Sequence, residues 1–146
     1  MIMSSDKPLF DLNYIKLPDK ERILLLERLA SRLKADPEIL FAYVYGSFIK
    51  REFFKDLDVA VWLKNLSKAF SYVVDFSARL EIELGVPVDV QVLNEAPLPF
   101  KFHVLTEGKL LCSEDEVFRV KLVDEVIRNY LDLKFELSHA KGILTS

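Results

Sequence analysis

An α+β fold of layered α/β type, in which helices cover a mixed β-sheet, is the fold class that this sequence predicts. Apolar residues recur at helical spacing in some stretches and at strand spacing in others, and the two kinds of stretch alternate along the chain. The length of 146 residues, 51% of them hydrophobic, suits one sizeable core. We therefore expect a single layered domain over residues 1–146.

Composition narrows the classes of function. With 29% charged residues and a net charge of −3, the chain lacks a broad basic face, so we expect no direct nucleic-acid partner. The only cysteine, Cys112, cannot form an intramolecular disulfide, and the N-terminal stretch lacks the pattern of a signal peptide. No apolar run approaches the roughly 20 residues that cross a bilayer. A cytoplasmic protein without a membrane partner is expected.

The first helix is expected from Asp19 to about Lys34, after an N-terminal tail of about residues 1–18 with a weak pattern. Asp19 can cap its N-terminus, and Pro37 stops it. The expected apolar stripe consists of Ile23, Leu26, Leu29, Ala30 and Leu33.

Two strands follow this helix. Residues 39–45, ILFAYVY, are β-branched and aromatic and lead into a sharp turn at Gly46-Ser47. After a short charged segment, alternation of apolar residues returns over residues 57–63. We expect a strand on each side of the turn.

A second helix and a third strand are expected next. Ser67 can cap a helix that runs to about Leu84, where Gly85 and Pro87 end it. Its apolar face is expected to contain Phe70, Val73, Val74, Ser77, Leu80 and Leu84. The stretch from Val86 to Leu93 alternates like a strand.

A long helix is expected at the C-terminus, over about residues 113–138. Ser113 and Glu116 have the spacing of a capping box. The apolar side chains of this helix cover more than one stripe: Val123, Val126, Ile127, Tyr130, Leu131, Phe135 and Leu137. We expect most of them in the core and the end of the helix in an interface of a homo- or hetero-oligomer.

Acidic residues occur in two of the strands. In DLDVAVWL (56–63), a period of two places Asp56 and Asp58 on the face opposite the apolar side chains, and in VDVQV (88–92) it does the same for Asp89. An Asp-x-Asp alone is more often a solvated edge or a turn cap than a metal site. If the two strands are neighbours, however, three carboxylates can meet. Like charges so close together favour a bound cation, and hard oxygen ligands suit Mg²⁺ or Mn²⁺.

The same segments resemble a known signature. Tyr45-Gly46-Ser47-Phe48, followed by Asp56-Leu57-Asp58-Val59 and by Val88-Asp89-Val90, resembles the signature of the DNA polymerase β-like nucleotidyltransferase superfamily. Within it, the chain is most similar to the minimal nucleotidyltransferases called MNT, the antitoxin partners of HEPN-domain toxins. The resemblance covers roughly residues 20–112 and implies the nucleotidyltransferase fold.

The resemblance implies a catalytic role for the three aspartates. Asp56 and Asp58 would bridge two Mg²⁺ ions, for which Mn²⁺ can substitute, and one of the ions would be carried by ATP as the nucleotide donor. Asp89 would join them on the other ion, which activates the attacking hydroxyl for in-line displacement of pyrophosphate.

Four further residues are candidates for nucleotide binding. Gly46 would let the backbone approach the triphosphate, and the Ser47 hydroxyl and nearby amides would donate to its oxygens. Lys50 and Arg51 could neutralise phosphate charge, although two exposed basic residues on a short helical segment are equally typical of a solvated surface.

The connection after Ser47 departs from the family pattern. Only the eight residues 48–55 separate Ser47 from Asp56, and the usual glycine and serine are missing. Lys55 stands where a serine is common. A shortened connection would change the shape of the triphosphate pocket while leaving the carboxylates intact.

Three functions are compatible with these residues. The resemblance implies an antitoxin that transfers AMP from ATP to a tyrosine hydroxyl of a HEPN-domain RNase toxin. A non-catalytic antitoxin that acts by stoichiometric binding is disfavoured, because a pure binder has no physical need for clustered like charges. A small-molecule nucleotidyltransferase generally needs a second region to shape the acceptor pocket, for which little chain remains.

Overall fold

A computed structural model describes residues 14–145 of the chain. Its elements, in chain order, are β1 (Ile15–Lys16), α1 (Asp19–Lys34), β2 (Ile39–Tyr45), α2 (Ser47–Lys50), β3 (Phe53–Phe54), β4 (Leu57–Leu63), a 3₁₀ turn (Leu66–Lys68), α3 (Ala69–Ser71), a π-helical turn (Tyr72–Phe76), α4 (Ser77–Leu84), β5 (Val88–Val92), α5 (Leu98–Glu107), β6 (Lys109–Ser113) and α6 (Glu116–Thr145). The predicted bounds of α1, β2 and β4 are confirmed, and the predicted third strand is confirmed as the shorter β5.

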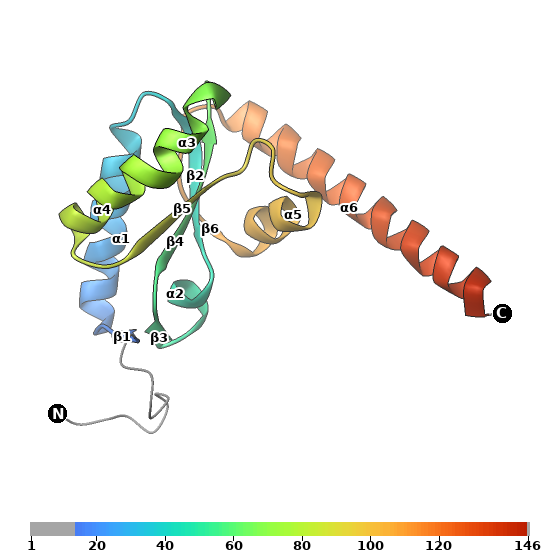
Figure 1. Cartoon of the computed structure of the whole chain (residues 1–146), viewed down its shortest axis with the longest axis horizontal. Helices are drawn as coiled ribbons and strands as arrows, with labels where there is room; N and C mark the ends of the chain where they lie inside the picture. Colours follow the sequence, from blue (N-terminus) through green and yellow to red (C-terminus); the bar gives the residue numbers. More distant parts are fainter. Residues whose placement is uncertain (1–13, 146) are drawn as a thin grey trace.

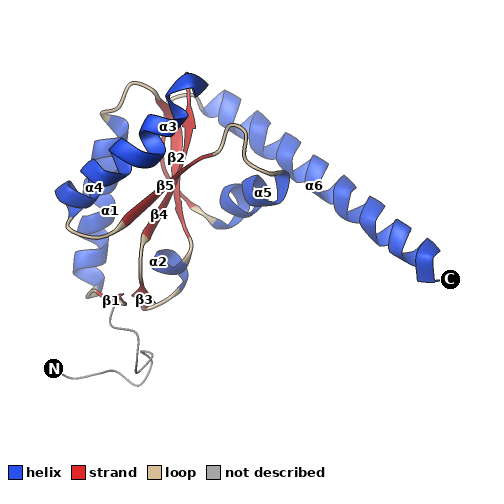
Figure 2. Cartoon of the chain, viewed as in Figure 1, coloured by secondary structure: helices blue, strands red, loops and turns tan. Residues whose placement is uncertain are grey.

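A four-stranded mixed sheet forms the centre of the molecule (Figure 2). Its strand order is β5-β4-β2-β6, with β2 antiparallel to both β4 and β6, and β4 parallel to β5. The chain between β4 and β5 crosses over through α3 and α4, as a parallel pair requires. The short strands β1 and β3 pair separately. The predicted α+β fold with a mixed sheet is therefore confirmed.

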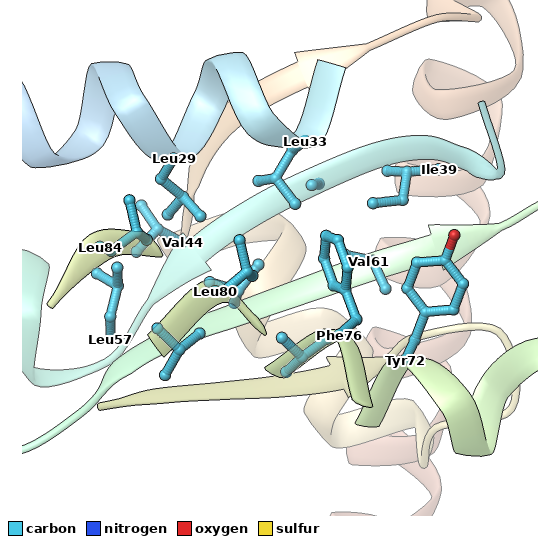
Figure 3. Packing of buried hydrophobic residues seen from close by; sticks show 14 of the residues in the cluster. Leu29, Leu33, Ile39, Val44, Leu57, Val61, Tyr72, Phe76, Leu80 and Leu84 are labelled. Carbon is cyan, nitrogen blue, oxygen red and sulfur yellow. The ribbon is translucent and has the colours of Figure 1, made fainter. Parts of the chain in front are cut away.

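Helices cover both faces of this sheet (Figure 1). Helices α1 and α4 lie on one face, and α5 lies with the beginning of α6 on the other. Strand alternation divides the buried residues accordingly: Leu57, Val59 and Val61 of β4 pack towards α1 and α4, as the close view of Figure 3 shows for Leu57 and Val61. Ala60 belongs to the second core with Val104 of α5. Asp58, two residues before Ala60, lies on this second face.

Helix α1 is turned differently from the prediction. Asp19 is its first residue rather than its cap, and the preceding Pro18 makes no side-chain cap. Ile23 was expected in the core but is 58% exposed, whereas Leu25 is buried. The reason is Arg22, whose guanidinium lies 4.3 Å from the centre of the Phe48 ring. The inward face of the helix therefore begins with an arginine, which binary patterning counts as polar.

The helical segment before α4 also differs from the prediction. The side chain of Asn65, not Ser67, is the cap, and it accepts a hydrogen bond from the Ser67 amide at 3.1 Å. Of the six residues expected on the apolar face, three are exposed: Phe70, Val73 and Val74. Tyr72 and Phe76 are buried in their place. Tyr72 and Phe76 of the π-helical turn follow one another in a row with Leu80 against the sheet (Figure 3).

Two elements of the second face were not predicted. Helix α5 follows Pro97 and carries Pro99 in its first turn, a signal of a helix start, but its short segment lacks a single apolar stripe. Strand β6 has five residues and is an edge strand. Both elements are needed here, because they complete the sheet and cover the face on which Asp58 lies.

The C-terminal helix α6 begins later and ends later than predicted. Ser113 is the last residue of β6, and Asp115 is the cap, accepting from the Phe118 amide at 3.0 Å. The expectation that most of its apolar residues lie in the core is wrong, because only Val126 of the seven is buried. The end of the helix extends away from the body (Figure 1), where Phe135 is 72% exposed. Among residues 14–145, neither α6 nor another helix combines the length and the apolar character needed to cross a bilayer.

Candidate active site

The in-register pairing of β4 with β5 places two of the predicted aspartates side by side. Asp58 is the direct partner of Asp89 across the parallel pair, and on its other side Asp58 pairs with Tyr45 at the end of β2. Neighbouring strands lie about 4.8 Å apart, so both carboxylates leave the sheet from adjacent positions on one face. The expectation that the two acidic strands are neighbours is confirmed.

The third aspartate, Asp56, lies just before β4, two residues from Asp58. Asp56 and Asp89 are exposed and Asp58 is partly buried. Burial, together with the negative charges of Asp89 and Asp56, raises the pKa of Asp58 to about 6. Burial, Asp58 and Asp89 together also raise the pKa of Tyr45. The three carboxylates therefore repel one another across a partly buried site.

Gly46 is required at this site for two reasons. Its backbone, at φ 81° and ψ −153°, adopts a conformation that L side chains rarely reach. A Cβ at this position would also lie 2.3 Å from Oδ2 of Asp58, well inside van der Waals contact. The turn after β2 therefore approaches the Asp58 carboxylate more closely than a residue with a side chain could.

Ser47 begins the single-turn helix α2, which a hydrogen bond and an aromatic contact hold in place. The amide of Arg51 donates to the Ser47 carbonyl at 2.8 Å, and the buried Phe48 packs edge-on against Phe54 with ring centres 4.8 Å apart. Ser47 is thus fixed directly after Gly46, whose backbone lies against Asp58.

Lys50 extends from α2 across to the end of α5. Its Nζ donates to Oε2 of Glu107 at 3.1 Å, and Nδ1 of His103 lies 2.5 Å from the same oxygen. The hydrogen bond and charge of Lys50 lower the pKa of Glu107, with a smaller effect from His103. Lys50 is therefore paired with Glu107, an acid that the sequence analysis did not select.

Arg51 directly follows α2, at the start of the connection to β3. It lines a hollow of about 560 Å³ together with Lys50, Arg22 and Lys16, on the side of α2 that faces α1. Arg22 holds α2 and the segment between α2 and β3 in place, because it donates to the backbone carbonyls of Phe48, of Arg51 at 3.1 Å and of Glu52 at 3.2 Å. A triphosphate role for Arg51 stays a prediction.

Sequence reasoning missed three residues that support this site: Arg22, Gln91 and Glu107. Arg22 and Glu107 act on segments 26 to 57 residues away in the chain, and no local pattern announces them. Gln91 could have been found, because strand alternation places it on the face of Asp89. Its Nε2 donates to Oδ1 of Asp89 at 3.1 Å.

The predicted metal centre is not preassembled. Within residues 14–145, no three histidine, cysteine, aspartate or glutamate side chains come together as a set that could hold a metal ion. The backbone places Asp58 and Asp89 next to each other, and the exposed side chains of Asp56 and Asp89 can change rotamer freely. The strands fix where the carboxylates start, and the side chains retain freedom to converge.

Comparison with solved structures gives several with the same fold. A chain from the complex of tri-AMPylated Shewanella oneidensis HEPN toxin with MNT antitoxin has a TM-score of 0.62 and 19% identity, covering 86% of this chain and 99% of that one. A chain from the toxin–antitoxin MntA-HepT has a TM-score of 0.60 and 20% identity, covering 84% and 99%. A third, from a toxin–antitoxin solved with AMP-PNP, has a TM-score of 0.59 and 19% identity, covering 88% and 100%.

Comparison of sequences identifies the family. No curated protein matches the chain. The profile of the family described as "Polymerase beta, Nucleotidyltransferase", however, matches residues 27–117, more than half of the chain. The matched range contains the Gly46 turn and both strands that carry the aspartates. The predicted resemblance is thereby confirmed, and the chain is a nucleotidyltransferase of the polymerase β family.

Proposed function

We propose that this nucleotidyltransferase transfers AMP from ATP to a tyrosine hydroxyl of a HEPN-domain RNase toxin, and so acts as an antitoxin. The observation that carries the proposal is the in-register pair Asp58 and Asp89, with Gly46 closed against Asp58. The fold likeness supports the choice of acceptor, because the matched complex contains a tri-AMPylated HEPN toxin and a related one contains AMP-PNP.

The residues present fit divalent cations. The donors are carboxylate oxygens, which Mg²⁺ prefers and Mn²⁺ accepts. Burial and, after it, the charges of Asp89 and Asp56 raise the pKa of Asp58, and a bound cation would favour its ionised form. Asp56 and Asp58 would hold two ions, and Asp89 would share one of them. When bound, the ions would neutralise the phosphate charge that develops during in-line displacement.

The remaining residues would bind the triphosphate. The Gly46 turn brings its backbone against Asp58 with no side chain between them, and the Ser47 hydroxyl would donate to a phosphate oxygen. Lys50 would exchange its partner Glu107 for a phosphate, and Arg51 would add positive charge from the α1 side. In the transfer, the tyrosine oxygen forms a bond to the α-phosphorus, the bond from that phosphorus to the bridging oxygen breaks, pyrophosphate leaves, and the hydroxyl proton passes to water.

A contact-based contribution to neutralisation is favoured by one observation. Leu131, Phe135 and Leu137 are exposed on the part of α6 that extends beyond the body (Figure 1). An exposed apolar helix face is typical of an interaction surface, and it would hold the toxin while the hydroxyl reaches the active site. Stoichiometric binding and catalysis are then separable experimentally.

The test compares Asp89→Asn with the parent and with Asp75→Asn, an exposed aspartate of the π-helical turn, as matched control. Each is co-expressed with a HEPN-domain protein from the same genome, whose intact mass is then measured. Removing a group that assists only the transition state lowers transfer and leaves ground-state binding. We expect the mass added by AMP with the parent and with Asp75→Asn, and no added mass with Asp89→Asn.

Binding is measured separately, so that loss of fold or of partner does not imitate loss of catalysis. Asp89→Asn should keep most of its thermal stabilisation by Mg-ATP and should copurify with the HEPN protein. If Asp89→Asn protects cells as well as the parent and no mass is added in either case, neutralisation acts by contact and transfer is refuted.

A further inference from the structure

A second hollow lies at the open edge of the sheet, beside β5. Its volume is about 530 Å³. Leu66 and Ala69 line it from one helical layer, Pro97 and Phe100 from the other, and Gln91 and Val92 from the strand between them. Glu95 supplies its only charge, so the hollow is largely apolar and slightly negative. We call it the edge hollow.

Side chains of α4 accept hydrogen bonds from the outward backbone amides of β5 as far as the edge hollow, but not within it. The outward amide of Val88 donates to Glu81 at 3.0 Å, and that of Val90 donates to Ser77 at 3.2 Å. Hydrogen-bonding direction alternates along a strand, so the amide of Val92 also points outward. In the described part of the chain, no side chain of α4 reaches Val92 as Glu81 and Ser77 reach their amides. The edge therefore offers a donor at the hollow.

Gln91 links the edge hollow to the candidate active site. Gln91 lines the hollow and also donates its side-chain amide to Asp89 at 3.1 Å. A molecule in the hollow that touches Gln91 therefore lies one hydrogen bond away from the carboxylate proposed to serve the acceptor.

The in-line geometry of the transfer decides whether the nucleotide or the acceptor can occupy the edge hollow. The attacking oxygen and the leaving pyrophosphate stand on opposite sides of the phosphorus. The proposed triphosphate residues Gly46 and Ser47 follow β2, and β4 with Asp58 lies between β2 and β5. The acceptor hydroxyl must then approach from the β5 side. Glu95 also disfavours a phosphate in the hollow and is compatible with a peptide.

We propose that the edge hollow seats the segment of the acceptor protein that carries the modified hydroxyl. An apolar side chain of that segment enters between Leu66 and Phe100, and its extended backbone accepts a hydrogen bond from the Val92 amide, as in strand addition to a sheet edge. The proposal rests on protein modification as the function of the site, and it assigns specificity for the acceptor to residues outside the nucleotidyl-transfer machinery.

The test places a charge in the hollow. Leu66 is 37% exposed, so Leu66→Glu is tolerated by the fold and makes the hollow more negative and polar; Ala96→Trp fills the hollow by volume instead. Ile82→Glu, at an 83% exposed apolar position of α4 outside the hollow, is the matched control. Transfer of AMP to the HEPN protein is measured at varied acceptor and varied ATP, and affinity for the same protein is measured by calorimetry without ATP.

Both hollow variants should raise the KM for the acceptor and its Kd at least about tenfold, which corresponds to one lost apolar anchor. The KM for ATP and kcat at saturating acceptor should stay within threefold of the parent, and Ile82→Glu should change neither. A raised KM for ATP would assign the hollow to the nucleoside and overturn the proposal, as would unchanged acceptor KM and Kd. If the parent transfers nothing while Leu66→Glu still weakens binding, the docking site stands and the proposed transfer fails.

Discussion

Replacing Gly46 by alanine tests the close approach of the Gly46 backbone to Asp58 in the candidate active site. The substitution adds only a methyl group, but it places that group 2.3 Å from Oδ2 of Asp58. Carbon and oxygen atoms in contact need more than about 3 Å, so the carboxylate or the turn must move by roughly 1 Å. Displacing a catalytic group by about 1 Å can cost on the order of 100-fold in rate. We expect Gly46→Ala to lower AMP transfer by at least that factor.

The stability loss can be judged from the backbone. A non-glycine residue at φ 81° and ψ −153° lies in a region that is essentially restricted to glycine, and such strain costs about 1–3 kcal/mol. For a domain of this length, 1 kcal/mol corresponds to a Tm change of about 4 °C. Gly46→Ala should therefore lower the Tm by about 4–12 °C and leave a folded protein at room temperature.

Gly85 provides the matched control. It ends α4 at φ 75° in the left-handed conformation, but a Cβ there meets nothing within 4 Å. Gly85→Ala should thus lose about 1–2 kcal/mol through backbone strain and keep both transfer and the thermal shift by Mg-ATP. Melts with and without Mg-ATP and a transfer assay at 20 °C would separate the two effects. If Gly46→Ala retains the parent's transfer rate and Mg-ATP shift, the close approach of Gly46 to Asp58 has no part in catalysis.

Three further substitutions give separate expectations. Because the folded protein raises the pKa of Asp58 to about 6, its contribution to stability is full below the unfolded value of 3.8 and is lost as pH rises through 6. In EDTA at pH 7, the free energy of unfolding of Asp58→Asn should therefore exceed that of the parent by on the order of 2 kcal/mol, and near pH 3.5 the two should be equal. Thermal melts that show no difference between the two proteins at either pH would contradict this. Arg22→Met should lower the free energy of unfolding by about 2 kcal/mol and speed proteolysis of the connection after α2, since three backbone carbonyls lose a charged donor. Arg79→Met is the control, and equal rates of proteolysis of this connection in Arg22→Met and the parent would refute the role of Arg22. Phe135→Lys should weaken the complex with the HEPN protein at least tenfold, while the parent complex should persist in about 0.5 M salt; dissociation of the parent complex at that salt would point to an electrostatic interface instead.

Strand periodicity predicted on which face of the sheet the three candidate aspartates lie, because its information is local. Alternation in residues 56–63 and 88–92 correctly separated the aspartates from the core, and the parallel pairing of β4 with β5 then brought Asp58 beside Asp89. The same alternation placed the Leu57 and Val59 side chains in the core.

The failures have a common physical cause. Ile23 was expected inside because helical patterning ranks isoleucine above arginine, but the Arg22 guanidinium finds carbonyls and an aromatic ring 26 or more residues away. Ser67 and Ser113 had the right chemistry for caps, yet Asn65 and Asp115 stood nearby and made the bonds. Competition among adjacent cap residues, and partners supplied by distant segments, are decided by tertiary structure.

The partly buried carboxylate of Asp58 links the stability of the fold to its activity. At neutral pH this carboxylate is largely ionised, although burial and the negative charges of Asp89 and Asp56 disfavour its ionised form. The ligand-free site therefore holds unfavourable charge. Cations that arrive with ATP would remove that charge, and their binding energy would be divided between holding the nucleotide and relieving the repulsion. A variant without the repulsion, such as Asp58→Asn, is then expected to be more stable alone and less stabilised by Mg-ATP. These opposite changes in one variant distinguish a cation site from a structural carboxylate, whose removal would lower stability in both conditions.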